Sequence, residues 1–209
     1  MDINQFKKLP IMGILRGVGL DTIEALVESV VSSGLKTIEI TMNTPAAPRL
    51  IRQMVASADS RLMIGAGTVL TLDDLKAALD AGATFIVLPT LVREVVEYCR
   101  KKNISVFPGA LTPQEIYNAW QAGATMVKVF PAKFFGPAYF KEIKAPLAGI
   151  ELLACGGVRP DNIKEFFSAG ASAVAFGASV FKPEWLKKRD FLSIEKSIKA
   201  LIGKLAFSG

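Results

Sequence analysis

The stretch AGATFIVLP at residues 81–89 decides the fold, because close copies of it recur as AGATMVKVFP at residues 122–131 and AGASAVAFG at residues 169–177. A looser copy, SGLKTIEIT, occupies residues 33–41. In each copy a helical pattern ends at a glycine suited to a left-handed cap, and a run rich in β-branched and aromatic residues follows. Each interval between copies contains one further short apolar run, so the repeating unit is one strand plus one helix.

This repeat predicts strands near residues 11–15, 36–41, 62–66, 85–88, 105–107, 125–130, 151–155 and 172–177. Helices are predicted at residues 3–8, 20–33, 45–57, 71–81, 91–102, 112–121, 137–144, 160–168 and 187–205. Strict alternation of apolar strands and helices indicates a parallel sheet covered by helices. Eight such units predict an α/β fold, a single (β/α)8 TIM-barrel domain over residues 1–209. The alternative is an open doubly wound sheet, although its GxGxxG fingerprint is absent.

The composition, 51% hydrophobic and 21% charged over 209 residues, fits one large globular core. No apolar run reaches the roughly 18 residues of a membrane span, and the apolar segment at residues 11–15 is too short for a signal peptide. We therefore expect a cytoplasmic protein with no membrane partner. The net charge of +6 comes from dispersed basic residues without interleaved aromatics, so no nucleic-acid partner is expected. Dispersed lysines can instead help to attract an anionic substrate.

The chain contains no histidine, which excludes His-based triads, His general bases and His metal ligands. Its two cysteines, Cys99 and Cys155, are far apart and indicate neither a disulfide framework nor a zinc site. Proton transfer must therefore depend on Glu, Asp, Lys, Tyr, Cys or water.

Two charged residues interrupt apolar strands. Lys128 lies between two valines, and Glu39 lies between two isoleucines. Alternation along a strand predicts that both face the barrel interior, from the second and sixth strands and from opposite sides of one layer. A purely structural ion pair is one interpretation. The functional interpretation is an amine nucleophile with a carboxylate acid–base, because apolar surroundings favour the neutral amine that attacks a carbonyl.

Glycine-bearing turns follow the predicted seventh and eighth strands, as CGGV at residues 155–158 and FGAS at residues 176–179. Glycines let the backbone approach an anion, and loops at these two positions commonly bind phosphate in this type of barrel. The alternative is that the glycines only make a tight turn. The predicted phosphate site consists of Gly156, Gly157, Gly177, Ala178 and Ser179.

Two further polar residues lie at predicted strand ends. Arg16 ends the first strand, beside the eighth in a closed barrel, where it could pair with a phosphate or a carboxylate or simply lie on the surface. Thr68, in GAGTV, suits the small carboxylate of a keto acid. Helix capping is its alternative role, although Thr71 and Asp74 suffice for the cap.

Taken in order, the motifs ILRG, EIT, GAGTVL, VKVFPA, FGP, GGV and GAS resemble the 2-keto-3-deoxy-6-phosphogluconate (KDPG/KHG) aldolase family over essentially the whole chain. The resemblance implies a class I lyase that needs no metal and no cofactor. Such an enzyme cleaves 2-dehydro-3-deoxy-6-phosphogluconate into pyruvate and glyceraldehyde 3-phosphate through a Schiff base, with 4-hydroxy-2-oxoglutarate as a further candidate substrate. It also implies a homotrimer. The implied roles are Schiff-base lysine for Lys128, general acid–base for Glu39, and substrate contact for Arg16, Thr68, Asn43, Pro89, Phe130 and Cys155.

Three positions depart from the family pattern. Asn43 stands where an arginine binds the pyruvyl carboxylate, and Cys155 stands where threonine is common, which affects the expected preference at C4 of the substrate. Lys133 replaces a residue that is often acidic, and we interpret it as a solvated loop lysine.

The sequence leaves more than one function open. The family's galactonate branch resembles this chain in LPIMGILRG, in the asparagine of MNTP and in FGPAYFKEIKA. This makes 2-dehydro-3-deoxy-6-phosphogalactonate the alternative substrate. A phosphosugar isomerase or epimerase with Glu39 as base is a second candidate function, and a non-catalytic assembly subunit is a third.

Overall fold

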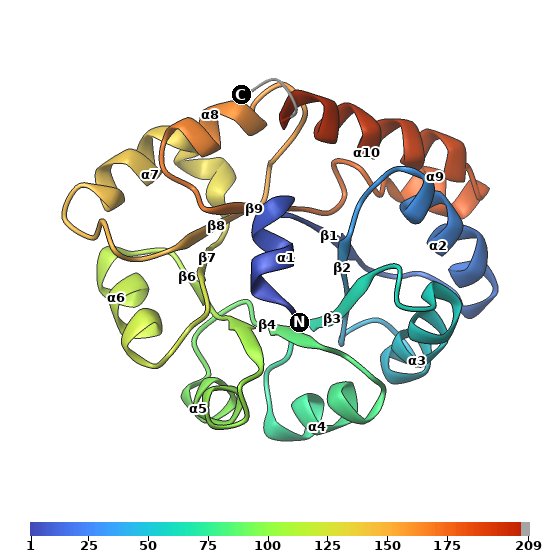
Figure 1. The fold of residues 1–209 in the computed structure, drawn as a ribbon, viewed down its shortest axis with the longest axis horizontal. Helices are drawn as coiled ribbons and strands as arrows, with labels where there is room; N and C mark the ends of the chain where they lie inside the picture. The colour runs from blue at the N-terminus through green and yellow to red at the C-terminus, as the bar shows by residue number, and fades with distance from the viewer. Residues whose placement is uncertain (206–209) are drawn as a thin grey trace.

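Parallel β-strands form the centre of the molecule, and helices surround them (Figure 1). The computed structural model describes residues 1–205, so residues 206–209 of the predicted domain lie outside the described residues. The sheet order is β5-β4-β3-β2-β1-β9-β8-β7-β6, and every neighbouring pair is parallel. The predicted TIM barrel is confirmed. Its strands are β1 (Ile11–Leu15), β2 (Thr37–Thr41), β3 (Met63–Gly67), β4 (Phe85–Val87), β5 (Ser105–Phe107), β6 (Gly109–Ala110), β7 (Val127–Val129), β8 (Leu152–Cys155) and β9 (Ala173–Phe176).

The fifth predicted strand, residues 105–107, is β5, and a short strand that was not predicted, β6, follows it, which gives nine strands within the described residues instead of eight. Pro108 separates β5 from β6, and a proline has no N–H to donate to a sheet. β5 pairs with β4, whereas β6 pairs with β7. The N–H of Lys128 donates to the carbonyl of Pro108 over 2.9 Å, so the circle of strands closes at this point.

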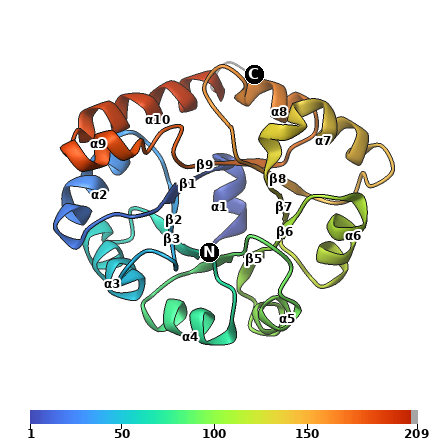
Figure 2. The same cartoon turned by 180° about the vertical axis from the view of Figure 1, so that it is seen from behind.

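Helices follow the strands as predicted, apart from small differences in bounds and larger differences at three places. One is the 3₁₀ helix η2 (Ala132–Phe134), which was not predicted. The predicted helix at 20–33 begins as the 3₁₀ helix η1 (Leu20–Thr22), and the predicted helix at 187–205 is two helices, α9 and α10. Both views of the ribbon show the helices that follow β1 as an outer ring, with α1 at the centre (Figures 1 and 2). The helices are α1 (Ile3–Lys8), α2 (Ile23–Ser32), α3 (Ala47–Ala58), α4 (Leu72–Asp80), α5 (Arg93–Lys101), α6 (Pro113–Gln121), η2 (Ala132–Phe134, 3₁₀), α7 (Gly136–Lys144), α8 (Ile163–Ser168), α9 (Pro183–Lys188) and α10 (Phe191–Leu205).

The strands separate two apolar cores. Side chains such as Ile38 and Val127 belong to the larger core between the strands and the helix ring. Phe85, Phe107 and Leu153 belong to a smaller core inside the barrel. Successive residues of a strand point to opposite faces, so this partition fixes which positions of each strand face inward.

Helix α1 closes the N-terminal end of the barrel and crosses its centre in both ribbon views (Figures 1 and 2). Phe6 is completely buried and meets Phe107 edge to face, with the ring centroids 6.1 Å apart. Lys7 forms an ion pair of 2.6 Å with Glu151, which immediately precedes β8. Because this end is plugged, the C-terminal ends of the strands are the end at which an active site can open.

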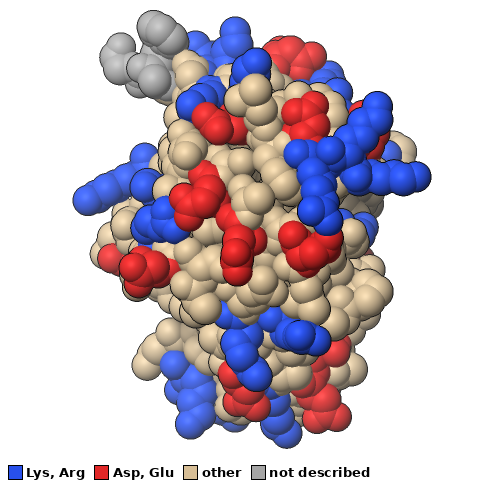
Figure 3. All heavy atoms as spheres, turned by 90° about the vertical axis from the view of Figure 1, so that its right-hand side faces the viewer, with Lys and Arg blue, Asp and Glu red and all other residues tan. Residues whose placement is uncertain are grey.

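Lysine and arginine side chains are interspersed with aspartate and glutamate on the face shown in Figure 3. None of the helices in residues 1–205 has the length and apolarity needed to cross a bilayer.

Candidate active site

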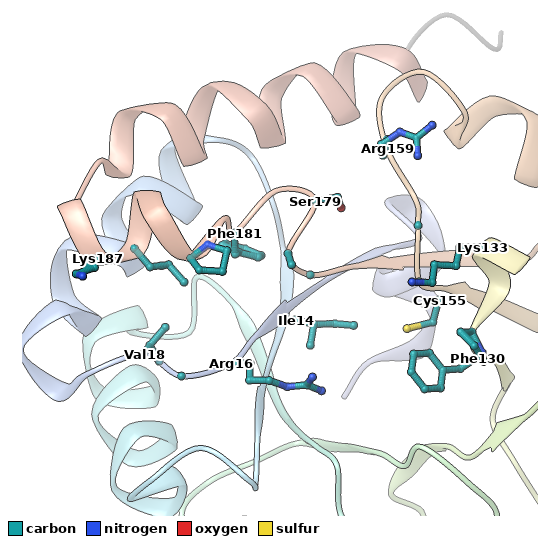
Figure 4. A pocket seen from close by; sticks show the side chains of 18 of the residues that line it. Ile14, Arg16, Val18, Phe130, Lys133, Cys155, Arg159, Ser179, Phe181 and Lys187 are labelled. Atoms are coloured by element: carbon teal, nitrogen blue, oxygen red, sulfur yellow. The ribbon is translucent and has the colours of Figure 1, made fainter.

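A cavity of about 1250 Å³ opens at the C-terminal ends of the strands. It lies between the loops that follow β1, β7, β8 and β9 (Figure 4). Loop clusters at this end of a TIM barrel hold the active site in essentially all characterised enzymes of this fold. Eight of the predicted site residues line the cavity: Arg16, Phe130, Cys155, Gly156, Gly157, Gly177, Ala178 and Ser179.

Lys128 and Glu39 both face the barrel interior, as their alternation with apolar neighbours predicts. The residues on either side of each belong to the core behind the strands, so the two charged side chains point the other way. Lys128 is 6% exposed and Glu39 is 1% exposed. Both ionisable groups are therefore held in nearly solvent-free surroundings. Among the described residues no ion pair joins them, and neither lines the main cavity.

Burial raises the pKa of Glu39 to about 7, although the positive charges of Lys128 and Arg16 act in the opposite direction. Oε2 of Glu39 has no hydrogen-bond partner among the described residues. A buried carboxylate oxygen without a partner is costly in a purely structural residue. A pKa near neutrality suits a group that must both accept and donate a proton.

The ammonium group of Lys128 lies 5.2 Å from the centroid of the Phe130 ring. Phe130 is 40% exposed and lines the cavity, so this contact links the buried lysine to the open site. Lys128 also acts on Cys155, whose pKa is raised by burial and lowered in part by the lysine charge. The net effect keeps Cys155 as a protonated thiol at neutral pH.

Two consecutive glycines turn the chain sharply after β8. Gly156 and Gly157 have φ values of 95° and 82°, in the left-handed region that favours glycine. The Oγ of Ser179 donates to the carbonyl of Val158 over 2.8 Å, which ties the loop after β9 to the loop after β8. Both predicted phosphate loops therefore border the same part of the cavity.

Arg16 is exposed and reaches from the end of β1 toward Cys155 and Phe130 (Figure 4). The next residue, Gly17, adopts a φ of 68° and donates its N–H to Oγ1 of buried Thr44 over 3.1 Å. This hydrogen bond fixes the backbone that presents the arginine. The positive charge of Arg16 lowers the pKa of both Glu39 and Cys155, against the larger effect of burial.

Three predicted contact residues do not line the main cavity. Thr68 is half-buried after β3 with a φ of 55°, and Asn43 is exposed after β2. Pro89 instead lines a second cavity of about 180 Å³, which Phe130 also borders. The structure therefore brings neither Asn43 nor Thr68 into the cavity wall.

Sequence reasoning missed the basic residues on the rim of the cavity, which are Lys133, Arg159, Lys187 and Arg189. Lys133 follows β7 by only a few residues, and Arg159 follows the glycine turn after β8. For Lys133 and Arg159 the available signal was their position, just beyond the C-terminal end of a strand, whereas Lys187 and Arg189 belong to α9 and its C-cap. Within residues 1–205 no cluster of three or more His, Cys, Asp or Glu side chains is placed to bind a metal.

Comparison with known proteins places this barrel among the aldolases. The family model for KDPG and KHG aldolase matches residues 3–197. The 2-dehydro-3-deoxy-6-phosphogalactonate aldolase of Escherichia coli (strain K12) is 35% identical over 176 residues, which are 84% of this chain and 86% of that protein. The 2-dehydro-3-deoxy-phosphogluconate aldolase of Haemophilus influenzae is 32% identical over 180 residues, 86% of this chain and 84% of that protein.

A solved structure described as "Native KDPGal structure" superposes with a TM-score of 0.89 at 32% identity and covers 95% of each chain. The fold and the relatives together define a TIM-barrel lyase. This chain belongs to the KDPG and KHG aldolase family.

Proposed function

We propose that this aldolase cleaves 2-dehydro-3-deoxy-6-phosphogalactonate into pyruvate and glyceraldehyde 3-phosphate, and accepts the gluconate epimer, through a Schiff base on Lys128. The observation that carries the proposal is that Lys128 and Glu39 are both buried and both face the barrel interior. Burying two ionisable groups in a small core costs free energy that apolar side chains would not cost. A chemical requirement for an amine beside a carboxylate explains that cost.

The reaction follows from the two groups. The amine of Lys128 adds to the C2 carbonyl of the substrate, and loss of water from the carbinolamine gives an iminium ion. Glu39 accepts the proton of the C4 hydroxyl, and the C3–C4 bonding electrons move into the iminium as the bond breaks. This step releases glyceraldehyde 3-phosphate and leaves the enamine of pyruvate. Protonation at C3 and hydrolysis then release pyruvate and restore the amine.

The two ends of the substrate fit different parts of the cavity. Arg16 reaches toward Cys155 and Phe130 and is our candidate for the substrate carboxylate. The turns at Gly156–Gly157 and Gly177–Ser179 are our candidate for the phosphate. Asn43, Thr68 and Pro89 stay predictions without a supporting contact.

The choice between the C4 epimers is supported by the relatives. The 35% identical protein of Escherichia coli carries the galactonate name, and so does a probable galactonate aldolase of Rhizobium meliloti at the same identity. The gluconate aldolase of Haemophilus influenzae is 32% identical. The small difference favours the galactonate substrate and leaves the gluconate epimer as a second substrate.

Incubation with pyruvate and borohydride tests the mechanism. Borohydride reduces an iminium to a stable secondary amine, so the protein should gain one reduced pyruvate, located on the peptide that contains Lys128. The Lys128→Ala variant should gain none, whereas Lys133→Ala should label like the wild type. If the wild type turns over a phosphosugar without any adduct, an isomerase or epimerase that uses Glu39 as base replaces the aldolase mechanism.

The homotrimer and the cytoplasmic location expected from the sequence are part of the same proposal. Light scattering coupled to gel filtration measures the mass of the assembly, and fractionation of the source cells locates the protein. A monomer in solution would contradict the proposed assembly.

A further inference from the structure

We propose that Lys133 is a specificity-determining residue that pairs with the substrate phosphate and restricts the enzyme to phosphorylated substrates. This inference rests on the proposed function and deepens it. The sequence alone favours a solvated loop lysine at this position. In the structure Lys133 is exposed and also lines the cavity, beside the glycine turn after β8 (Figure 4).

Lys133 is packed directly against the glycine turn. A Cβ atom on Gly157 would lie 2.6 Å from Cβ of Lys133, closer than two such atoms approach in proteins. The stem of the lysine therefore covers the position where a side chain at Gly157 would stand. This close contact holds the Cβ atom of Lys133 at the edge of the proposed phosphate subsite.

The ammonium group of Lys133 has no carboxylate partner within residues 1–205. Its neighbour is the ring of Phe134, whose centroid lies 5.0 Å away. Phe134 is 69% exposed, so this contact does not neutralise the charge. The lysine is consequently available to an anion that enters the cavity.

The other polar side chains around the turn either have hydrogen-bond partners already or lie elsewhere in the cavity. Arg159 donates from Nε and Nη2 to Asp161, over 3.0 Å and 3.2 Å. The hydroxyl of Ser179 donates a hydrogen bond to the carbonyl of Val158 over 2.8 Å. The serine oxygen can therefore accept a further hydrogen bond but cannot donate one. Lys187 lies on the opposite side of the cavity from Lys133 (Figure 4).

A phosphate monoester carries about −1.5 to −2 charges at pH 7 and accepts several hydrogen bonds. The backbone of the glycine turn can donate hydrogen bonds but supplies no full positive charge. Lys133 is the cation beside the turn that lacks a counter-charge, so it should provide the charge-assisted contact. An unphosphorylated keto acid would leave this ammonium unpaired.

Substitution of Lys133 tests the inference with two readouts. Lys133→Ala should lower the ratio of kcat/KM for the phosphorylated over the unphosphorylated 2-keto-3-deoxy acid by about ten- to a hundredfold. Lys133→Arg should retain most of the ratio. The affinity for inorganic phosphate, measured by calorimetry without any turnover, should fall by a similar factor in Lys133→Ala. The matched control is Lys141→Ala, because Lys141 is an exposed lysine of α7 that does not line the cavity.

The outcomes separate this inference from the proposed function. If Lys133→Ala and Lys141→Ala have the same substrate ratio and the same phosphate affinity, the role of Lys133 is overturned, even though pyruvate still forms its adduct. If both substrates lose activity equally, Lys133 has a general structural role and the inference is also overturned. If the wild type forms no pyruvate adduct, the proposed mechanism fails, while the phosphate affinities still decide whether Lys133 binds phosphate.

Discussion

Gly67 lies directly against the carboxylate of Glu39: a Cβ atom on Gly67 would collide with Oε1 of Glu39. The contacted group is the far end of a flexible side chain, so a methyl group here should turn the carboxylate aside while the barrel still folds. We expect Gly67→Ala to slow cleavage by about 10²-fold or more, on the scale of losing an acid–base group. Steady-state kinetics, together with circular dichroism to verify the fold, measure this effect.

The exchange of the pyruvate methyl protons gives a second readout for Gly67→Ala, because exchange needs the acid–base group after the Schiff base has formed. Gly149→Ala is the control, since nothing lies within 4 Å of a Cβ atom at Gly149. Normal proton exchange in Gly67→Ala would remove Glu39 from its proposed role.

Removal of the positive charge at Lys128 should raise the pKa of Glu39 above its value of about 7. Burial raises this pKa and the charge of Lys128 lowers it. Lys128→Met removes that lowering effect, so the pKa of Glu39 should rise. Titration of the Glu39 carboxyl carbon by nuclear magnetic resonance in both proteins measures the shift. Lys133→Met is the control for a charge removed elsewhere in the site. An unchanged pKa in Lys128→Met would mean that the two groups do not interact.

The raised pKa of Glu39 also predicts how stability depends on pH. The folded protein holds this proton up to about pH 7, whereas an unfolded chain loses it near the ordinary value of 4.5. Between these values the folded state binds more protons, so the Glu39 contribution to the free energy of unfolding falls as pH rises. The loss is on the order of 3 kcal/mol, from the size of the shift.

Comparison with Glu39→Gln isolates this effect, because glutamine keeps the shape and has no titrating proton. Urea unfolding from pH 4.5 to pH 8 should show the wild type losing stability relative to the variant, with most of the loss below pH 7. A constant difference between the two proteins across this range would contradict the raised pKa.

The sequence predicts the barrel and its inward-facing charges because both depend on local pattern. The glycine-ended repeat marks each helix–strand junction, and the alternation around Lys128 and Glu39 fixes which face each residue occupies. The break between β5 and β6 at Pro108 follows from the missing N–H of proline. The pattern does not predict this break, because residues 105–107 alone contain the apolar signal.

The cavity wall cannot be predicted in the same way, because loop conformations decide it. Thr68 follows β3 with a φ of 55°, a conformation that a threonine rarely adopts, and the GAGTV pattern gives no sign of it. The sequence favours a solvated Lys133 because the contact of this lysine with Gly157 joins two loops that are distant in sequence. Such contacts appear only when the strands have been placed side by side.

The last prediction concerns Cys155 and the choice between the C4 epimers. Cys155 lines the cavity at the end of β8, between the glycine turn and the side of the site where Phe130 and Lys128 lie. Its pKa is raised by burial, so the group is a neutral thiol, which is a poor hydrogen-bond donor. It therefore offers little to distinguish one orientation of the C4 hydroxyl from the other. The wild type should process both epimers with modest selectivity.

Cys155→Thr should shift the ratio of kcat/KM toward the gluconate-derived substrate, because a threonine hydroxyl can donate to the substrate hydroxyl. One neutral hydrogen bond contributes on the order of 1 kcal/mol, so the shift should be about tenfold and not absolute. Cys155→Val is the matched control, since valine has the shape of threonine without its hydroxyl group. Both epimers are assayed with all three proteins under identical conditions. A changed kcat/KM ratio in Cys155→Thr but not in Cys155→Val supports a hydrogen bond at C4. Equal changes in both variants indicate that the shape of the side chain alone decides the preference. If neither variant changes the ratio, Cys155 does not contribute to recognition of the C4 hydroxyl, and another part of the pocket determines the stereochemical preference.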